Sequence, residues 1–345
     1  MSFWQNSKKP LVGLAPMDGV TDEPMRYVTA KYGQPKVIFT EFVNVEYAAR
    51  QPNKLLERFI YSPLEKPIVA QISGVAPDLF YQFAFVAAYL GFDGVDINIG
   101  CPSRSVTHRG GGAALIGNRK RVQELVLSAR TALDDWQAGK KIESVITCRR
   151  ILLTVKAIEK KNQNLEVRDK PTRAGLSVKT RLGIKKTCVD DWLGFLASLP
   201  LETIILHGRT LEAGHFGPVD WIAIARAAKI AHRQGKIFLG NGGVKSQTEA
   251  RKLSKDYGLD GVLIGRGAMG NPWVFSNKIP SRRERLSVMM EHVYYYLDLF
   301  GSGDFISLRK HLAWYAKGFP GARKLRNRLV KTNSLSEVEE IVSSF

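Results

Sequence analysis

The sequence is poor in cysteine and has no long apolar run. Its three cysteines, Cys101, Cys148 and Cys188, form an odd and widely spaced set, which neither frames disulfides nor matches the spacing of zinc ligands. The longest strongly apolar stretch, residues 83–90, is far shorter than the roughly 20 residues that cross a bilayer. Residues 1–10 lack the apolar segment of a secretion signal. We therefore expect a soluble, unexported cytoplasmic protein that binds neither a metal nor a membrane, and we expect a monomer.

Acidic residues are too few to balance the basic ones. Lys and Arg number 51 and Asp and Glu number 32, which leaves a net charge of +19. Such a charge indicates a polyanionic partner, with nucleic acid the first candidate and an anionic membrane the second. Apolar residues make up 44% of the 345 positions, enough to bury a full core, which excludes a disordered or fibrous protein.

Short runs rich in Val, Ile, Leu and Phe recur along residues 1–280, with helix-like segments between them. This alternation is typical of βα units on a parallel sheet, and eight such runs close a (β/α)8 TIM barrel. We predict this α/β barrel over residues 1–280. The predicted strands are Leu11–Ala15, Lys36–Thr40, Pro67–Gln71, Asp93–Ile97, Leu176–Arg181, Thr203–His207, Lys236–Gly240 and Asp260–Ile264.

Three of the segments between the strands carry helix-start signals. Residues 22–31 and 78–90 begin with an aspartate that is suited to cap a helix. Ser246 is followed three residues later by Glu249, which is the signature of a capping box. We expect helices over these two segments and over residues 246–257.

Two basic segments lie outside the eightfold pattern. Residues 139–173 are long for one connection, and residues 104–173 hold 16 basic and 7 acidic residues, so we predict a basic, partly helical insertion. After residue 280 the helical period takes over, with apolar residues spaced to line one face. We predict a small all-helical domain over residues 281–345. Its residues 281–331 hold 11 basic and 4 acidic residues, enough to contact several phosphates.

Polar and glycine-rich residues follow the predicted strands at the end where barrel enzymes assemble their sites. Asn241-Gly242-Gly243 follows the seventh strand, and Gly265-Arg266-Gly267 follows the eighth. Glycine N–H groups and a cation bind phosphate at this place in barrels, so we predict a mononucleotide phosphate site. The alternative is that these glycines only form tight turns.

Pro16-Met17 follows the first predicted strand, and Gln71 ends the third. A flat apolar contact and a bidentate amide could together hold a heteroaromatic ring such as a flavin, although Met17 could also simply pack in the core. Lys179 shares one face of its strand with Ser177 and Arg181. A lysine that points into the barrel could stabilise the negative charge of a reduced flavin, unless acidic residues at other strand ends satisfy both cations.

Cys101 lies between Gly100 and Pro102 after the fourth strand. A thiol of ordinary pKa, about 8.5, is mostly protonated at neutral pH and can give a proton, so this setting favours catalysis over the ordinary role of a small buried hydrophobe. His207 ends the sixth strand and could hydrogen-bond a flavin or a substrate carbonyl, or it could be a core histidine.

Two segments have the composition of RNA-binding surfaces. Residues 104–112 form a glycine-rich basic loop beside the cysteine, which could clamp a substrate backbone or be a solvated turn. Residues 309–315 and 323–328 interleave cations with aromatic side chains, as RNA-binding surfaces do. A solvated helix face is the alternative, but the overall charge favours RNA contact.

The ordered set of motifs resembles the tRNA-dihydrouridine synthases, flavoenzymes that reduce specific uridines of tRNA, over nearly the whole chain. The matching segments are residues 14–22 (LAPMDGVTD), 71–74 (QISG), 96–115, 178–183 (VKTRLG), 207–210 (HGRT), 241–244 (NGGV), 261–270 and 309–329.

The resemblance implies an FMN cofactor, NADPH as reductant and tRNA as substrate. It implies that NADPH reduces FMN, that the flavin delivers hydride to C6 of a flipped uracil in the D-loop, and that Cys101 protonates C5. The FMN-binding residues it implies are Pro16, Met17, Asp18, Gln71, Lys179, His207, Asn241, Gly242, Gly243, Gly265 and Arg266. The substrate-binding residues, with Asn98 on the uracil and the C-terminal helices on the tRNA, are Asn98, Arg104, Arg209, Arg323, Arg326 and Arg328.

The sequence departs from the family pattern at several positions. An acidic residue is usual where Gly243 stands, a lysine is frequent where Arg104 stands, and tyrosine is common where His215 stands. The segment 139–173 is longer than we expect for the family, and it is either an extra tRNA contact or a solvated excursion. Two other functions compete: a flavin-dependent barrel reductase of a free pyrimidine or other small molecule, and a non-catalytic RNA-binding protein on the same scaffold.

Overall fold

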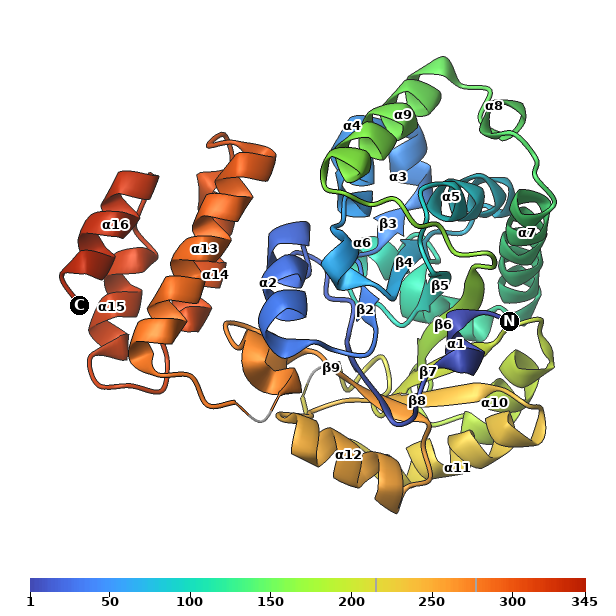
Figure 1. Ribbon diagram of the computed structural model, residues 1–345. Helices are drawn as coiled ribbons and strands as arrows, with labels where there is room; N and C mark the ends of the chain where they lie inside the picture. The colour runs from blue at the N-terminus through green and yellow to red at the C-terminus, as the bar shows by residue number, and fades with distance from the viewer. Residues whose placement is uncertain (215, 277) are drawn as a thin grey trace.

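The computed structural model describes residues 1–214, 216–276 and 278–345, and it shows a closed barrel of parallel strands with helices around it and four further helices at the C-terminal end (Figure 1). Each barrel strand pairs in parallel with the next, and the β1–β9 and β2–β4 pairings close the ring. The predicted TIM barrel is therefore confirmed. The eight barrel strands are β1 (Leu11–Leu14), β2 (Ile38–Phe39), β4 (Ile68–Ser73), β5 (Gly94–Ile99), β6 (Gly175–Arg181), β7 (Thr203–His207), β8 (Ile237–Asn241) and β9 (Gly261–Ile264).

A short additional strand, β3 (Val43–Asn44), was not predicted. It pairs in parallel with the last residues of β4, Ile72 and Ser73. The second barrel strand, β2, is regular only over Ile38–Phe39, so β3 takes up the pairing that β2 leaves at the carboxyl end of β4. The sequence showed a single apolar run at residues 36–40 because β2 and β3 are both short and follow each other closely.

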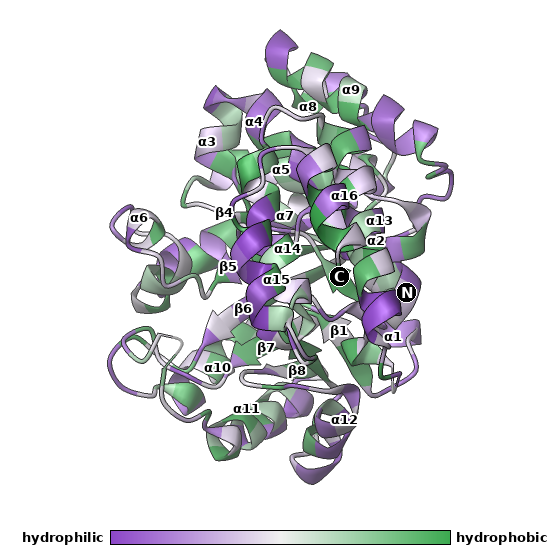
Figure 2. Cartoon of the chain, turned by 90° about the vertical axis from the view of Figure 1, so that its left-hand side faces the viewer, coloured by the Kyte–Doolittle hydropathy of each residue, from purple (hydrophilic) through white to green (hydrophobic). Residues whose placement is uncertain are grey.

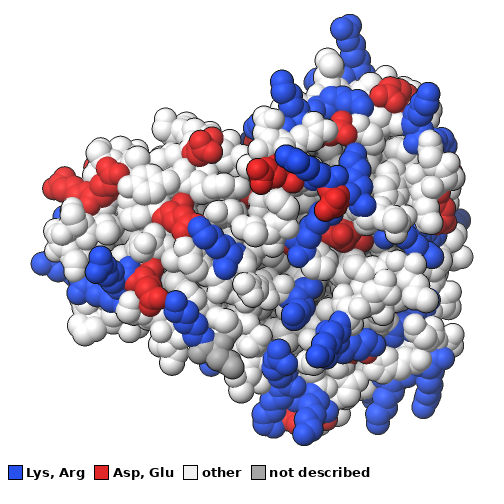
Figure 3. Space-filling model, viewed as in Figure 1, with Lys and Arg blue, Asp and Glu red and all other residues white. Residues whose placement is uncertain are grey.

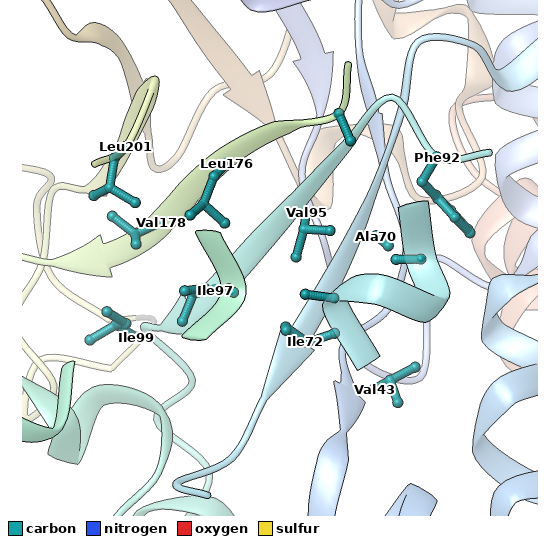
Figure 4. Close-up of a cluster of buried hydrophobic side chains, with 14 of the residues drawn as sticks. Val43, Ala70, Ile72, Phe92, Val95, Ile97, Ile99, Leu176, Val178 and Leu201 are labelled. Atoms are coloured by element: carbon teal, nitrogen blue, oxygen red, sulfur yellow. The ribbon is translucent and has the colours of Figure 1, made fainter. Parts of the chain in front are cut away.

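Three hydrophobic clusters hold the fold together. The largest lies between the strands and the surrounding helices, and Figure 4 shows side chains of β4, β5 and β6 within it. A second cluster fills the barrel interior and includes Trp4 of the short N-terminal helix α1 (Phe3–Asn6). A Cβ atom on Gly175 would lie 2.5 Å from the indole of Trp4. The indole therefore closes the amino end of the barrel against bare backbone, which leaves the carboxyl end for a site.

The barrel helices begin largely where the sequence predicted. Asp22 caps α2, because its side chain accepts the N–H of Met25 at 3.0 Å, and Ser246 caps α12 by accepting the N–H of Glu249 at 3.1 Å. Asp78 does not cap α5, which begins at Pro77 and has Ala76 at its N-cap. The helices of the barrel are α2 (Glu23–Gly33), α3 (Val45–Arg50), α4 (Pro52–Leu56), α5 (Pro77–Tyr89), α6 (Arg104–Thr107), α7 (Arg119–Gln137), α8 (Ile142–Val145), α9 (Arg149–Asn164), α10 (Val189–Ser198), α11 (Trp221–Arg233) and α12 (Gln247–Asp256), with short 3-10 turns at Glu57–Phe59, Pro63–Glu65, Gly112–Gly117, Arg266–Ala268 and Pro272–Phe275.

The basic segment 139–173 contains α8 and α9. Helix α9 packs on α4 by its apolar face, and the Asn162 side chain donates to the Phe59 carbonyl at 3.1 Å and accepts from the Tyr61 N–H at 3.2 Å. Its other face stays in solvent with Arg149, Lys160 and Lys161 exposed, and basic side chains crowd this upper part of the molecule in Figure 3. One face of the segment 139–173 therefore packs on the barrel, and its other face presents basic side chains to solvent.

The C-terminal helices are α13 (Arg282–Phe300), α14 (Phe305–Tyr315), α15 (Ala322–Leu329) and α16 (Leu335–Ser343). They bury Met289, Val293 and Leu325 in a cluster of their own, which Val28 and Trp273 of the barrel complete. The exposed side of α15 is strongly hydrophilic (Figure 2). In the described part of the chain, no helix is long and apolar enough to cross a membrane.

The C-terminal helices pack on the barrel through helix α2. Tyr295 of α13 stacks on Tyr27 with ring centroids 4.1 Å apart, and its hydroxyl donates to Glu23 at 2.7 Å. Lys31 and Glu291 form an ion pair at 2.7 Å beside them. Because α2 directly follows the loop after β1, the C-terminal helices are fixed to one wall of the barrel mouth.

Candidate active site

A cavity of about 910 Å³ opens at the carboxyl end of the barrel strands. Every residue that the family resemblance assigned to FMN lines this cavity, and so do Asn98 and Cys101. The residues around it are Ala15, Pro16, Met17, Asp18, Val20, Phe42, Gln71, Asn98, Gly100, Cys101, Pro102, Ser103, Lys179, Arg181, His207, Asn241, Gly242, Gly243, Val244, Lys245, Gly265, Arg266, Gly267 and Met269. Parallel strands deliver their last residues to one end of a barrel, which explains how positions far apart in the sequence meet here.

A chain of hydrogen bonds forms the floor of this cavity. The Ser177 hydroxyl donates to Asp96 at 2.7 Å, and Gln71 Nε2 donates to the other oxygen of Asp96 at 2.7 Å. Gln71 Oε1 accepts from Asn98 Nδ2 at 2.8 Å, and Asn98 Oδ1 accepts the N–H of Cys101 at 2.9 Å. The chain runs from the buried interior to the cysteine, so each amide is held in one orientation.

Asp96 was not assigned a role from the sequence. Burial raises the pKa of its carboxyl to about 6, while hydrogen bonds from Ser177 and Gln71 and the charge of Lys179 oppose the rise. Its signal was nevertheless present, because period two in the fourth predicted strand places Asp96 and Asn98 on the same face. A carboxylate on the inward face of an apolar strand needs polar partners, and here it orients Gln71.

Lys179 and Arg181 both point into the barrel mouth, as the alternation in their strand predicted. Burial and the charge of Arg181 lower the pKa of the Lys179 ammonium to about 8. Arg181 donates to the carbonyls of Gly100 at 2.7 Å and Gly214 at 2.8 Å. Its guanidinium therefore fixes the backbone next to Cys101, whereas the charge of Lys179 faces the cavity that it lines.

Cys101 lies on a tightly packed corner. Its carbonyl accepts the N–H of Ala113 at 3.1 Å, and a Cβ atom on Gly112 would lie 2.7 Å from that carbonyl oxygen. Gly112 has φ +57°, so glycine is needed there both for space and for conformation. Burial raises the pKa of the Cys101 thiol, and the nearby charge of Asp18 adds to the rise. The thiol therefore keeps its proton at neutral pH.

The side of the cavity formed by the loops after β8 and β9 has the features of an anion site. Gly242 and Gly243 follow β8 with φ of +137° and +71°, a backbone that an acidic residue at position 243 would adopt only under strain. Arg209 Nη1 is buried and has no hydrogen-bond partner among the described residues. Burial lowers the pKa of Arg209, and the charge of Arg266 lowers it further. Arg266 lines the cavity beside this glycine backbone, and Arg209 lies just outside the lining but close enough for the charge of Arg266 to act on it, so the two guanidinium groups together favour an anion such as a phosphate here.

The remaining predicted substrate residues lie outside the cavity lining. Arg104 is exposed on α6, and Arg209 donates to the Gly217 carbonyl at 2.7 Å. Arg323 and Arg326 are exposed on α15, whereas Arg328 donates to Ser344 Oγ at 2.8 Å. Their substrate contacts stay predictions. His215, the other departure from the family pattern, lies outside the described residues.

Two lysines of the C-terminal region, Lys310 on α14 and Lys317 just after it, reach the rim of the cavity; the sequence placed both in an RNA-binding segment but did not predict that they lie near the cavity. Lys317 Nζ donates to the carbonyl of Met269 at 2.6 Å. Lys310 Nζ lies 3.8 Å from the position of a Cβ atom on Gly19, in the loop after β1. Only the three-dimensional packing of α14 on the barrel brings them there, so no local pattern could have identified them.

Comparison with known proteins gives matches along the whole chain. A family model described as dihydrouridine synthase (Dus) matches residues 13–143 and 155–344, so that residues 144–154 of the basic segment fall outside the match. The chain is 31% identical over 359 residues to a probable tRNA-dihydrouridine synthase 2 of Bacillus subtilis, with 100% of this chain and 96% of the relative covered. It is 29% identical over 361 residues to a probable tRNA-dihydrouridine synthase of Staphylococcus epidermidis, again with 100% and 96% covered. By the extent of the family match, this chain belongs to the dihydrouridine synthase family.

Proposed function

We propose that this protein is an FMN-dependent, NADPH-reduced tRNA-dihydrouridine synthase that adds hydrogen across the C5=C6 bond of a D-loop uridine. The observation that carries the proposal is the composition of one cavity, which combines an anion site, a lysine beside a bidentate amide, and a protonated thiol. The printed names of the relatives from Bacillus subtilis and Staphylococcus epidermidis point to the same substrate.

The cavity residues fit FMN. Arg209 Nη1, which has no hydrogen-bond partner among the described residues, the charge of Arg266 and the glycine backbone after β8 suit the phosphate. Met17 and the Pro16 ring offer apolar contact to a flat ring system, and Lys179 offers a positive charge. When bound, FMN supplies the hydride that C6 of a uracil accepts, and NADPH restores the reduced cofactor.

The chain's own residues supply the proton and hold the base. Cys101 Sγ would donate its proton to C5 of the uracil, which a thiol of raised pKa can do because it remains protonated at neutral pH. Asn98 holds the N–H of Cys101, so it fixes the distance between the thiol and a bound base. The second hydrogen on the Asn98 amide, not used by Gln71, is free to contact the uracil.

The basic surface near the cavity suits tRNA. Arg323 and Arg326 on α15 are exposed, and Lys310 and Lys317 reach the cavity rim. Such cations contact phosphates on both sides of a flipped nucleotide. The free cysteines fit a reducing cytoplasm.

The experiment is nucleoside mass spectrometry of unmodified tRNA after incubation with the purified protein, FMN and NADPH, followed by site mapping. We expect the mass of two hydrogens to be gained at one uridine of the D-loop. Omission of NADPH is the control. A yellow protein that oxidises NADPH and leaves tRNA unchanged would replace the proposal with reduction of a small molecule.

A further inference from the structure

Three side chains that can bind a metal meet where α2, α13 and α14 converge, and none of the three is among the residues that line the cavity. Asp22 stands at the start of α2, His292 lies on α13 and His311 lies on α14. One ring nitrogen of each histidine and one carboxylate oxygen of Asp22 lie within 4.8 Å of one another. Two imidazoles and a carboxylate are a ligand set that binds divalent transition metals.

Both histidines are buried, with exposed fractions of 1% and 2%. The Nε2 atom of each has no hydrogen-bond partner among the described residues. His311 Nε2 lies 3.1 Å from Asp22 Oδ2, close enough for an ion pair, so its contact is with the carboxylate of the same cluster. Buried polar atoms are rarely left without a partner, so His292 Nε2, which has none among the described residues, indicates a missing ligand.

Two further polar atoms of the cluster are already engaged, which orients Asp22 and His292. Asp22 Oδ1 accepts the N–H of Met25 at 3.0 Å, which leaves Oδ2 for another contact. His292 Nδ1 lies 3.1 Å from the buried Tyr315 hydroxyl, which can accept its proton and leave the Nε2 lone pair available. Metal ligands are held in this manner by hydrogen bonds on the side away from the ion.

We propose that Asp22 Oδ2, His292 Nε2 and His311 Nε2 bind a Zn²⁺ ion that joins the C-terminal helices to the barrel. Ligand atoms on one zinc ion lie roughly 3.4 Å apart, and the three atoms here lie within 4.8 Å of one another, so the widest pair would close by at most about 1.4 Å as the ion binds. The Asp22 side chain is 18% exposed, which gives the ion an entry path and a water molecule as fourth ligand. The site is independent of the proposed reaction, because none of the three residues lines the cavity.

The test uses the untagged full-length chain, stripped with a chelator and then dialysed against Zn²⁺. Elemental analysis is expected to find about one Zn²⁺ per chain, and bound Co²⁺ is expected to show the visible absorption of a tetrahedral site. Zn²⁺ is also expected to raise the melting temperature of the wild-type chain, because an ion that binds only the folded state stabilises it.

Two variants and a control make the assignment specific. His292→Asn keeps a polar group near Tyr315 and loses Nε2, and His311→Gln loses imidazole coordination, so each is expected to weaken Zn²⁺ binding at least tenfold. His108→Asn, at an exposed histidine of the loop after α6, is expected to bind as the wild type does. No bound Zn²⁺ and no melting shift in the wild type would overturn the proposal and leave only the contact between His311 and Asp22. Zn²⁺ binding by the two variants as tight as that of the wild type would overturn it as well.

Discussion

At the scale of single residues, the site depends on a thiol that keeps its proton and a lysine that easily loses one. The two groups lie close enough for the charge of Lys179 to affect the pKa of the Cys101 thiol. Asp96, Gln71 and Asn98 connect the barrel interior to the Cys101 backbone. The residues that carry chemistry therefore have orientations set by side chains from neighbouring strands.

Replacement of Cys101 by alanine is expected to separate the two halves of the reaction. The variant should bind FMN and accept electrons from NADPH as the wild type does, because the thiol is not part of the anion site. Dihydrouridine formation should fall by roughly 10²- to 10⁴-fold, the usual contribution of a positioned proton donor. Stopped-flow reduction and tRNA nucleoside analysis measure the two halves. Normal turnover of tRNA would remove Cys101 from the mechanism.

The affinity for FMN is expected to fall as the pH rises above 8. Lys179, whose pKa is lowered to about 8, is charged below that pH and neutral above it, and an anionic ligand favours the charged form. Binding FMN would raise this pKa, so affinity should be constant between about pH 7, where the phosphate of FMN is mostly doubly ionised, and pH 8, and decline above pH 8 by roughly tenfold in all for one charge-assisted hydrogen bond. Fluorescence titration of FMN against pH measures the effect.

The matched comparison for that titration is Lys179→Met against Lys186→Met, since Lys186 is exposed. The first variant should bind FMN weakly at every pH and lose the dependence. If Lys179→Met retained the same decline above pH 8, another group would be responsible.

At the scale of elements, the sequence predicted the barrel because eight apolar runs each have the length of a strand, and all eight barrel strands lie within or close to them. It failed where local signals were ambiguous. The run at residues 36–40 did not reveal that β2 ends at Phe39 and that β3 continues the pairing. Asp78 had the right chemistry for a cap, but Pro77, whose fixed φ suits the first helical position, begins α5 instead.

Helix α15 is the element whose charge we expect to hold RNA. Arg323→Glu with Arg326→Glu should weaken tRNA binding by roughly tenfold or more and lower the slope of affinity against salt by about 1 to 2, because two phosphate contacts are lost. Filter binding across a salt series measures both. We choose these positions because Arg328 also contacts Ser344 and the Phe345 ring.

Arg251→Glu with Lys255→Glu on α12 is the control, since it changes the net charge equally at exposed positions of a barrel helix. FMN binding should be unchanged in both double variants. Equal loss of tRNA affinity in the two would show that only total charge matters and that α15 has no special place.

At the scale of the whole molecule, the junction between barrel and C-terminal helices buries several ionisable groups. Glu23 accepts from Tyr295 across the junction, and Arg26 pairs with Glu65 at 2.5 Å with both side chains fully buried. The sequence could not predict this junction or the cluster of Asp22, His292 and His311, because Asp22 and Glu23 lie more than two hundred residues before the side chains that they meet on α13 and α14, and only the docking of these helices unites them.

Glu23→Gln is expected to make stability less dependent on pH. Burial and the charge of Glu65 raise the pKa of Glu23 well above its usual range, so the folded state holds a proton that the unfolded state releases. This stabilisation is fully present below the pKa that Glu23 has in the unfolded chain. As the pH rises from that pKa to the higher pKa of the folded state, the free energy of unfolding falls by about 1.4 kcal/mol per pH unit.

Glutamine imitates the protonated acid, so the variant should match the wild type near pH 4 and exceed its stability by a margin that grows towards neutral pH. Urea unfolding at several pH values measures the difference. Glu249→Gln, on the exterior helix α12, is the comparison variant. A constant difference across pH would show that Glu23 is ionised in the folded state.

The junction on α2 also fixes a length. Helix α15 is joined to α2 through α14 and α13, and α2 also adjoins the cavity wall, so the separation between the exposed arginines of α15 and the Cys101 thiol is set by the fold. If these arginines bind RNA phosphates and the thiol protonates a base, as we propose, then that separation selects the uridine: among many identical bases, the one that lies at this distance from the bound phosphates reaches the cavity. Position along the RNA, rather than the base itself, would then distinguish one target from another.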